Sequence, residues 1–505
     1  MPTPKICGIE TEYGIFVRGA DMTPMTASSL IVNAYSDEGM SLRAWDFAGE
    51  HPDVDARDGW KPEADYPEVE MLMANTVLSN GSRFYVDHAH PELSTPECRS
   101  VSDALLYDRA GEEIIRRAMS RANSRLPEGV EIVLHKNNSD GKGNSYGCHE
   151  NYLVSRAVPF GALASSVTSH FVTRQVFTGS GKVGVECRRD GEEKVPFQIS
   201  QRADFFEEEV GLETTVRRPI VNTRDEPHCD PERWRRLHVI AGDANMSEVA
   251  TYLKLGSTAL VLALIEDGRF PRDLAIADPV TEMRRVSHDP NLRHAVTLSS
   301  GLSMRPIDVQ RLILDAVTAW FGGLDDDPTH GDGPRIISMW GEVLDLLDTG
   351  SESAAGMVDW VAKKRVFEAL VSRSSLHEAF DRMRAIDLQY HDMKPERCLA
   401  SRMGLQTLVD VDDVATAMTD PPHDTRAFFR GECIRRWPRQ VSAANWDSLV
   451  FDTGGPLLQR VPMMDPLKGT RAHVGALLAE VVTVTDLLEK LGRDNVESVA
   501  DDPGW

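Results

Sequence analysis

Residues 83–97, RFYVDHAHPELSTPE, gather side chains that bind metal ions, hold anions or move protons. The first six residues have the pattern of a β-strand, in which every second side chain points to the same face. One face would then carry Arg83, Tyr85 and Asp87. A guanidinium, a phenol and a carboxylate arranged in this way could hold a metal-bound phosphate beside an acid or base.

The residues that follow this strand extend the same chemistry. Pro91 predicts a turn, after which Glu92 and Glu97 add two further carboxylates. His88 would point away from the face of Asp87, and for His88 and His90 hydrogen bonding or packing is favoured over metal ligation. The stretch therefore predicts a group of acidic ligands with an arginine beside them.

A second pair of carboxylates occurs near the N-terminus, in the sequence GIETEYG. Residues 5–17 read as one strand, so Glu10 and Glu12 would share a face. Neighbouring carboxylates repel one another unless a cation lies between them, which indicates a metal site. A strand whose polar face meets water explains the pair at least as well, and both interpretations stay open at this point.

Two further polar segments could contact phosphate. Residues 136–152 place lysines, asparagines and glycines before His149, and such loops let backbone N–H groups approach an anion, although ordinary turns use the same residues. Residues 222–248 contain a dense cationic group: Arg224, Arg235, Arg236 and His238. Arginines of this kind clamp phosphate or carboxylate, or pair with the acidic residues next to them.

The elements that position these residues are strands first and helices later. Strands are predicted over 131–137, 151–155, 171–177 and 195–200. Ser100 predicts the start of a helix over 101–123. Further helices are predicted over 247–267, on both sides of a loop at 321–334, and over 474–491 with Gly492 at its end. The order lacks regular βαβ units and predicts an α+β fold with an antiparallel sheet.

The composition limits the function classes. A chain of 505 residues predicts a large domain with a smaller one. The net charge of -24 argues against a nucleic-acid partner. No apolar run of about 18 residues and no signal-peptide pattern is present, which predicts a cytoplasmic protein without a membrane span. The seven cysteines are widely spaced, which argues against a zinc or disulfide framework.

One long segment, about residues 35–68, has no regular periodicity and is strongly acidic. It holds ten Asp or Glu residues against three Arg or Lys residues. This composition predicts a mobile acidic loop, either a passive insertion or a lid over a site.

Several of these segments together resemble the Pup ligase/Dop family, which lies within the glutamine synthetase-like carboxylate–amine ligase superfamily. Its members act on the prokaryotic ubiquitin-like protein, Pup. The resemblance spans nearly the whole chain and is carried by GIETEYG, NGSRFYVDHAHPE, KNNSDGKGNSYGCHENYL, TGSGKVG, FQISQRAD, VGLETT, NTRDEPH, LHVIAGDAN, TYLKLGSTAL, DTRAFFRGE and NWDSLVFD. Two features, the spacing in VDHAHPE and the long 35–68 segment, resemble the deamidase/depupylase members rather than the ligases.

The resemblance implies an activity and its requirements. Deamidase/depupylase members convert the C-terminal glutamine of Pup to glutamate and hydrolyse the isopeptide bond between Pup and a substrate lysine. The alternative is the ligase activity that forms this bond. Either activity implies ATP, or ADP with phosphate, and Mg²⁺. The implied partners are Pup, pupylated proteins and the proteasomal ATPase ring. The implied architecture is a curved antiparallel sheet cradle over 1–425, with a small C-terminal domain over 426–505.

The resemblance also implies roles for individual residues. Asp87 matches the catalytic aspartate, as nucleophile or as base. The implied metal ligands are Glu10, Tyr85, Glu92, His149 and His238. The implied nucleotide-binding residues are Arg83, Thr95, Asn151, Arg236 and Trp446. Three arginines are assigned to substrate or phosphate: Arg202, Arg224 and Arg430.

Overall fold

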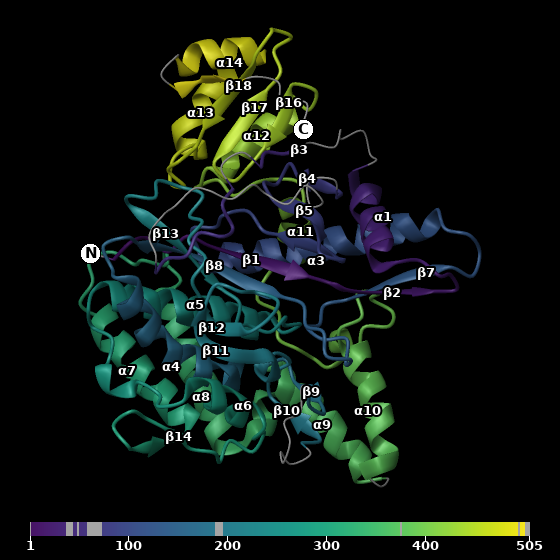
Figure 1. Ribbon diagram of the computed structural model, residues 1–505, viewed down its shortest axis with the longest axis vertical. Helices are drawn as coiled ribbons and strands as arrows, with labels where there is room; N and C mark the ends of the chain where they lie inside the picture. The colour runs from purple at the N-terminus through teal and green to yellow at the C-terminus, as the bar shows by residue number, and fades with distance from the viewer. Residues whose placement is uncertain are drawn as a thin grey trace.

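A six-stranded antiparallel sheet forms the centre of the protein (Figure 1). The computed structural model describes residues 2–36, 44–47, 50–57, 73–186, 195–373, 376–492 and 495–499. The strand order is β13-β8-β1-β6-β5-β4. Their bounds are β1 Cys7–Glu12, β4 Asn75–Val77, β5 Arg83–Asp87, β6 His90–Ser94, β8 Cys148–Ser155 and β13 Trp234–Val239.

Helices cover one face of this sheet. They are α1 (Pro24–Ser36), α3 (Val101–Ser124) and α5 (Glu248–Glu266), and each packs on one or more of the central strands. Phe84, Val86 and Leu93 point into this layer and are buried in the main hydrophobic core. Because side chains alternate along a strand, Arg83, Tyr85 and Asp87 point to the other face, as the sequence predicts.

The rest of the main body is mostly helical, with short strand pairs between the helices. The helices are α4 Phe160–Thr178, α6 Pro279–Ser287, α7 Pro306–Phe321, α8 Gly333–Gly350, α9 Asp359–Val371, α10 Leu376–Tyr390 and α11 Val411–Ala417. The strand pairs are β2 Gly14–Arg18 with β7 Glu131–His135, β9 Lys182–Val183 with β10 Phe197–Gln198, β11 Phe206–Gly211 with β12 Arg218–Asn222, and β14 Val296–Thr297 with β15 Ser303–Met304.

A five-stranded sheet lies at one end of the molecule, in the yellow and green part of Figure 1. Its order is β19-β18-β17-β16-β3, with bounds β3 Ala44–Trp45, β16 Val441–Ala444, β17 Ser448–Phe451, β18 Leu458–Pro462 and β19 Glu497–Val499. The helices α12 (Ala427–Arg436), α13 (Arg471–Glu480) and α14 (Val484–Leu491) accompany it. A separate hydrophobic core joins these elements. The predicted domain boundary at 425/426 stays a prediction.

The acidic 35–68 segment is partly described. Its residues 44–47 and 50–57 are ordered, and β3 pairs in parallel with β16 of the C-terminal sheet. Trp45 is only 2% exposed. Residues 44–47 are therefore fixed on the C-terminal sheet, whereas residues 50–57 contact the main body, where the N–H of Ala56 donates to Thr223 O at 2.8 Å. Residues 37–43, 48–49 and 58–68 lie outside the described residues.

The expected α+β class with an antiparallel main sheet is confirmed, and so are several elements. The predicted helices at 101–123 and 247–267 correspond to α3 and α5, and the 321–334 loop separates α7 from α8. Ser100 caps α3 by accepting a hydrogen bond from the backbone N–H of Asp103. Gly492 ends the last helix with a φ of 81°, which glycine adopts without strain.

Four predicted elements are wrong in type or extent. Residues 171–177 belong to helix α4, because a helix buried on all sides has no polar face and its β-branched residues imitate a strand. The strand predicted over 5–17 breaks at Tyr13 into β1 and β2, which lie in different sheets. The helix predicted over 474–491 is interrupted between α13 and α14, where Thr483 forms a capping box with Asp486. Within the predicted strand 195–200, only Phe197–Gln198 is strand.

One described helix, α5, is long and apolar enough to cross a membrane by composition. Its entire apolar window is buried inside the protein, as expected of a core helix.

A buried ion pair attaches the C-terminal elements to the main sheet. Arg426 Nε donates to Glu97 Oε1 at 2.6 Å, and Arg430 pairs with the other carboxylate oxygen. Burial acts to raise the pKa of Glu97, but the two guanidinium groups lower the pKa to about 2. The carboxylate is therefore charged across the whole ordinary pH range.

This ion pair gives the fold an acid-sensitive contribution. A carboxyl whose pKa falls from 4.5 to about 2 on folding contributes about 3 kcal/mol above pH 4.5, and the contribution disappears as the pH falls toward 2. We expect Glu97→Gln to lower the free energy of unfolding by about this amount at pH 7, and by much less near pH 2.5. Urea titrations at several pH values test this, and a pH-independent difference would show that the charge is not responsible.

Candidate active site

The face of the main sheet opposite α1, α3 and α5 carries most of the predicted site residues. Glu10 lies opposite His149 on β8 and Ser94 on β6, and Glu12 lies opposite Glu92 on β6. On the next strand, Tyr85 lies opposite Glu92, and Asp87 lies opposite His90. Directly opposed residues have neighbouring side chains, so the pairing register itself assembles the site.

The turn between β5 and β6 lies earlier than the sequence predicts. It consists of His88 and Ala89, and Pro91 is already within β6. His88 takes a φ of 51°, and its Nδ1 lies 2.8 Å from Asp87 Oδ2. The tight turn returns Glu92 beside Tyr85.

The first candidate metal group consists of Glu10, His149 and His238. One ligand atom of each lies within 4.8 Å of the others. His149 Nδ1 is 3.6 Å from Glu10 Oε2, and the two imidazole rings lie 4.9 Å apart. Burial acts to raise the pKa of Glu10, but His149, His238 and Arg236 hold it well below its usual value. A charged carboxylate with two imidazoles is a donor set that suits a divalent cation.

Asn151 and Arg236 hold this group in place. Asn151 Nδ2 donates to Glu10 Oε1 at 2.7 Å, and Arg236 Nη1 donates to Asn151 Oδ1, also at 2.7 Å. Arg236 Nη1 lies 3.6 Å from Glu10 Oε1. Asn151 and Arg236, two of the five predicted nucleotide-binding residues, therefore adjoin the first metal group.

The second candidate metal group consists of Glu12, Asp87 and Glu92, whose ligand atoms also lie within 4.8 Å of one another. Burial and the charges of Asp87, Glu12 and Glu10 raise the pKa of Glu92 well above its usual value. Burial and Glu92 likewise raise the pKa of Tyr85. A hard divalent cation such as Mg²⁺ takes carboxylate oxygens and would relieve this repulsion.

Glu12 belongs to this group, although the predicted set of metal ligands includes Glu10 and omits Glu12. The alternation in GIETEYG already places both carboxylates on one face, so that signal was present. Glu12 Oε1 accepts the N–H of Gly147 at 2.7 Å, and His90 Nδ1 lies 3.4 Å from Oε2. Burial opposes ionisation, but His90, His149 and Arg202 lower the pKa of Glu12 to about 2.

The loop that supplies Gly147 is itself braced. Tyr146 donates its hydroxyl to Asn137 Oδ1 at 2.8 Å, and its ring lies 4.6 Å from that of His90. The carbonyl of Tyr146 accepts from Asn138 Nδ2 at 3.1 Å and from Arg202 Nη1 at 3.0 Å. The position of Glu12 therefore depends on the whole of the 136–147 loop.

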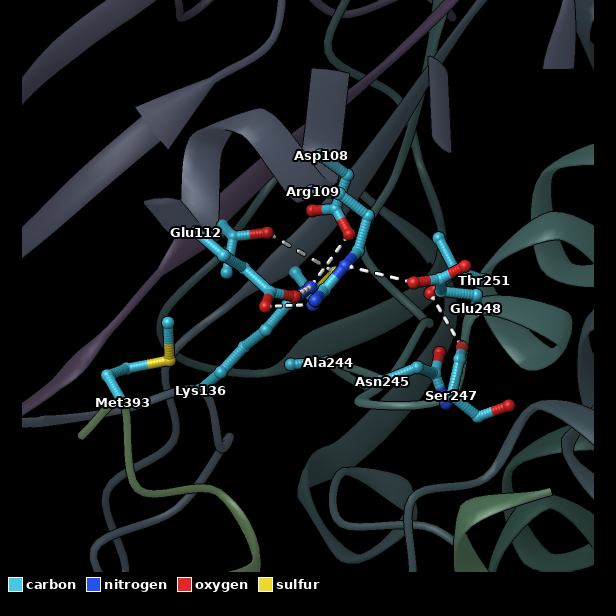
Figure 2. A network of polar contacts seen from close by, with 12 residues as sticks. Asp108, Arg109, Glu112, Lys136, Ala244, Asn245, Ser247, Glu248, Thr251 and Met393 are labelled. Atoms are coloured by element: carbon cyan, nitrogen blue, oxygen red, sulfur yellow. Dashed lines mark hydrogen bonds and ion pairs between the residues drawn. The ribbon is translucent and has the colours of Figure 1, made fainter. Parts of the chain in front are cut away.

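A buried network of charges anchors the start of this loop (Figure 2). Lys136 Nζ donates to Asp108 Oδ2 at 2.7 Å and to Glu112 Oε1 at 2.9 Å, both on α3. Arg109 extends the network to Glu248 at the start of α5, at 3.2 Å. The two carboxylates raise the pKa of Lys136 despite its burial.

Lys136→Met removes the ammonium group and leaves Asp108 and Glu112 without it. Because breaking a buried ion pair leaves uncompensated charge, we expect the free energy of unfolding to fall by about 3–5 kcal/mol. Urea denaturation measures the loss. Lys142→Met, at an exposed position of the same loop, should change stability by about 0.5 kcal/mol at most. Equal effects of the two variants would contradict an anchoring role for the network.

A cleft of about 90 Å³ adjoins the first metal group. Its lining includes Glu10 and four predicted nucleotide-binding residues: Thr95, Asn151, Arg236 and Trp446. Thr95 Oγ1 accepts the N–H of Ile9 at 3.0 Å, so its hydroxyl is held against β1. Arg83 lies beside Tyr85, with its guanidinium carbon 4.0 Å from the centre of that ring.

A second, larger cavity of about 940 Å³ lies between the β9–β10 pair and α10. Its charged lining is mixed, with Lys182 and Arg384 against Glu186 and Asp387. It shares Asn137, Ser139, Asp140 and Gly141 with the braced loop, but the six residues of the two metal groups lie outside its lining.

The three arginines assigned to substrate lie in different surroundings. Arg202 is buried near Glu12, its Nε has no hydrogen-bond partner among the described residues, and burial together with Arg218 lowers its pKa to about 10. The positive charge of Arg224 contributes, after burial and Arg236, to the lowered pKa of His238, and it also helps to lower the pKa of Glu226. Arg430 is fully buried and donates to Gly81 O, Trp446 O and Glu97. These contacts give Arg430 a structural role, and its contact with substrate stays a prediction.

An antiparallel sheet that presents one carboxylate–imidazole group and one carboxylate group beside a small cleft defines an α+β protein with a candidate metal-binding active site. The chain belongs to the family described as Pup-ligase protein, whose family model matches residues 5–450.

Among curated relatives, the depupylase of Acidothermus cellulolyticus is 47% identical, over 96% of this chain and 99% of the relative. The Pup deamidase/depupylase of Mycolicibacterium smegmatis is 45% identical over the same shares. The Pup–protein ligase of Nakamurella multipartita is 40% identical, over 80% of this chain and 90% of the relative.

Two solved structures share the fold. The complex between Pup and its ligase PafA matches with a TM-score of 0.79 and 29% identity, over 94% of this chain and 91% of that chain. PafA in complex with ADP matches with a TM-score of 0.72 and 31% identity, over 83% and 96% of the two chains. The expected family and fold are therefore confirmed.

Proposed function

We propose that this protein hydrolyses two amide bonds of Pup: the side-chain amide of its C-terminal glutamine, and the isopeptide bond that joins Pup to a substrate lysine. The relatives at 45–47% identity that span 96% of this chain carry the names depupylase and Pup deamidase/depupylase. The single structural observation that carries the chemistry is Asp87, which is part of the Glu12–Glu92 carboxylate group and is still 29% exposed to solvent.

The proposal includes a nucleotide and Mg²⁺. The two ligand groups fit divalent cations by their donor atoms, and the 90 Å³ cleft beside the first group collects the polar and aromatic residues expected to contact a nucleotide. The ADP complex of PafA supports nucleotide binding. When bound, Mg²⁺ would supply positive charge for phosphate and for a developing oxyanion.

The residues of this chain have separate roles in the proposed reaction. Asp87 lies at the exposed edge, where its carboxylate could attack the amide carbon to give an anhydride and release the amine. It could instead accept a proton from an attacking water. Hydrolysis in ¹⁸O-labelled water followed by mass spectrometry of the Asp87 peptide tests for the anhydride. Label in Asp87 supports an anhydride that water opens at the aspartyl carbonyl, whereas unlabelled Asp87 is expected both for the base and for an anhydride that water opens at the Pup carbonyl.

The ligase activity is the second candidate, because the family model and more distant relatives carry that name. Incubation of the full chain with Mg²⁺ and ATP distinguishes the two activities. We expect release of Pup ending in glutamate from a pupylated protein, and conversion of the C-terminal glutamine of Pup to glutamate, both followed by mass spectrometry. Attachment of glutamate-ended Pup to lysines without either hydrolysis would show that the protein is a ligase.

The proposal extends to the cell. A cytoplasmic location with Pup and pupylated proteins as partners is the setting that this activity requires, and the proteasomal ATPase ring is a further expected partner. The solved complex of Pup with PafA supports a direct contact with Pup.

A further inference from the structure

A continuous stack of aromatic rings and guanidinium groups links the main sheet to the C-terminal sheet. The guanidinium of Arg83 lies between two rings, 4.0 Å from the centre of Tyr85 and 3.8 Å from the centre of Trp45. The indole of Trp45 meets that of Trp446 edge to face at 5.4 Å. Arg430 lies 5.1 Å from the Trp446 ring and ends the stack.

The middle member of this stack, Trp45, comes from the acidic 35–68 segment, which adds the edge strand β3 to the C-terminal sheet. Its strand β3 is fixed on β16, and the next residue, Asp46, is held on three sides. Asp46 Oδ2 accepts from Arg460 at 2.7 Å and from Ser448 at 3.1 Å, and its carbonyl accepts from Asn445 at 2.6 Å. Trp45 is therefore fixed in position by the C-terminal sheet.

The segment also reaches the opposite edge of the main sheet, near β13. The indole N–H of Trp45 donates to Glu50, and the N–H of His51 donates to Glu226 Oε1 at 2.8 Å. The carbonyl of Glu226 in turn accepts from Arg236 Nε at 2.8 Å. Arg83 is on β5 and Arg236 is on β13, with β6, β1 and β8 between them. The same short segment thus contacts Arg83 and, through Glu226, Arg236; both are predicted nucleotide-binding residues, and Arg236 lines the candidate nucleotide cleft.

We propose that Trp45 is a positioning residue of the nucleotide site, which holds the guanidinium plane of Arg83 against Tyr85 so that the N–H edge of Arg83 stays directed at the nucleotide. This inference rests on the proposed nucleotide dependence. A guanidinium sandwiched between two ring faces keeps its donors in one plane, because the rings occupy both of its faces and the N–H groups point outward. Arg83 Nε already uses one such direction to reach Asn75 Oδ1 at 3.2 Å.

The stack also gives the acidic segment a defined part in the site. Without Trp45, Arg83 would have one ring face instead of two and would sample more rotamers, so binding a nucleotide would cost more conformational entropy. We therefore expect loss of the Trp45 ring to weaken nucleotide binding. An aromatic replacement should preserve the affinity, whereas an aliphatic replacement should not, because it fills the space without offering a π-face to Arg83.

The test measures binding of Mg²⁺–ADP to the full-length protein by calorimetry, with no Pup present. We expect Trp45→Phe to bind ADP within about twofold of the wild type, and Trp45→Leu to bind roughly tenfold more weakly. The matched control is Trp437→Leu. Trp437 is a buried indole of the same hydrophobic core and donates to Val482 O at 3.1 Å. This control should lose comparable stability and keep the wild-type affinity.

A double-mutant cycle with Arg83→Ala completes the test. We expect Trp45→Leu to add little to the loss already caused by Arg83→Ala, since both remove the same positioned guanidinium. Equal affinity of the Leu and Phe variants, additive losses in the cycle, or an equal loss in Trp437→Leu would each overturn the inference. Failure of the wild-type protein to bind ADP would instead overturn the proposed nucleotide dependence on which the inference rests.

Discussion

Asp87→Asn should abolish hydrolysis of both Pup amide bonds, with turnover reduced by about 10³-fold or more, while the affinity for Mg²⁺–ADP changes by about twofold at most. The substitution keeps the size of the side chain and its hydrogen bond with His88, but it removes the charge that either attack or proton transfer requires. The candidate nucleotide cleft and the first metal group beside it are made of other residues, so we expect binding of Mg²⁺–ADP there to persist without the Asp87 charge.

Two measurements make this prediction specific. Turnover is followed with pupylated substrate and with glutamine-ended Pup, and nucleotide affinity is measured by calorimetry on the same preparations. Glu207→Gln, at an exposed position of β11, is the matched control and should leave both quantities unchanged. Turnover of the Asp87→Asn variant within tenfold of the wild type would remove Asp87 from the reaction. A parallel loss of nucleotide affinity would make it a binding residue.

The sequence was most informative where the chemistry lies along one strand. Alternation alone places Arg83, Tyr85 and Asp87 on one face and Glu10 beside Glu12, because these relations depend only on local backbone geometry. Helices α3 and α5 were equally accessible, since capping residues and long apolar patterns mark them. The suggestion that Glu10 and Glu12 together bind a cation follows from the same local pattern.

Relations between distant segments were not accessible in this way. Glu12 lies opposite Glu92 only because β1 pairs with β6 in one register, and a shift of one residue would point its side chain to the other face. The hydrogen bond from Gly147 to Glu12 joins residues 135 positions apart. Helix α4 was mistaken for a strand for a related reason, since complete burial in the tertiary structure erases the polar face that marks a helix.

The acidic segment shows the same limit in another form. Its composition predicts a mobile loop, and composition cannot reveal that Trp45 and Asp46 within it pair with a strand about 400 residues later in the chain. Strand β3 has only two residues, Ala44 and Trp45, which is too short a signal for a periodicity argument. Only the contacts show that Trp45 of this segment packs against Arg83 and Trp446, two of the predicted nucleotide-binding residues.

Gly147→Ala should disable both candidate metal groups at once while leaving the fold intact. A Cβ atom at position 147 would lie 2.2 Å from His149 Nε2 and 2.7 Å from Glu12 Oε1, and such contacts force both side chains to move. His149 belongs to the first ligand group and Glu12 to the second. Displaced ligands typically weaken metal binding by about 10–100-fold, so we expect activity at low Mg²⁺ to fall by at least that factor and to recover in part at high Mg²⁺.

The control for this variant is Gly161→Ala in α4, where an added Cβ meets nothing within 4 Å. It should keep the wild-type Mg²⁺ dependence and leave stability unchanged or slightly higher. Mg²⁺ titrations of Pup deamidation and thermal unfolding curves are measured for both variants. If Gly147→Ala unfolds at the wild-type temperature and keeps the wild-type Mg²⁺ dependence, then neither His149 nor Glu12 is a metal ligand. A loss of activity that no Mg²⁺ concentration restores, with the fold intact, would instead indicate that Gly147 controls the position of Asp87 through Glu12. The concentration dependence therefore separates a defect in holding the cation from a defect in the reacting carboxylate.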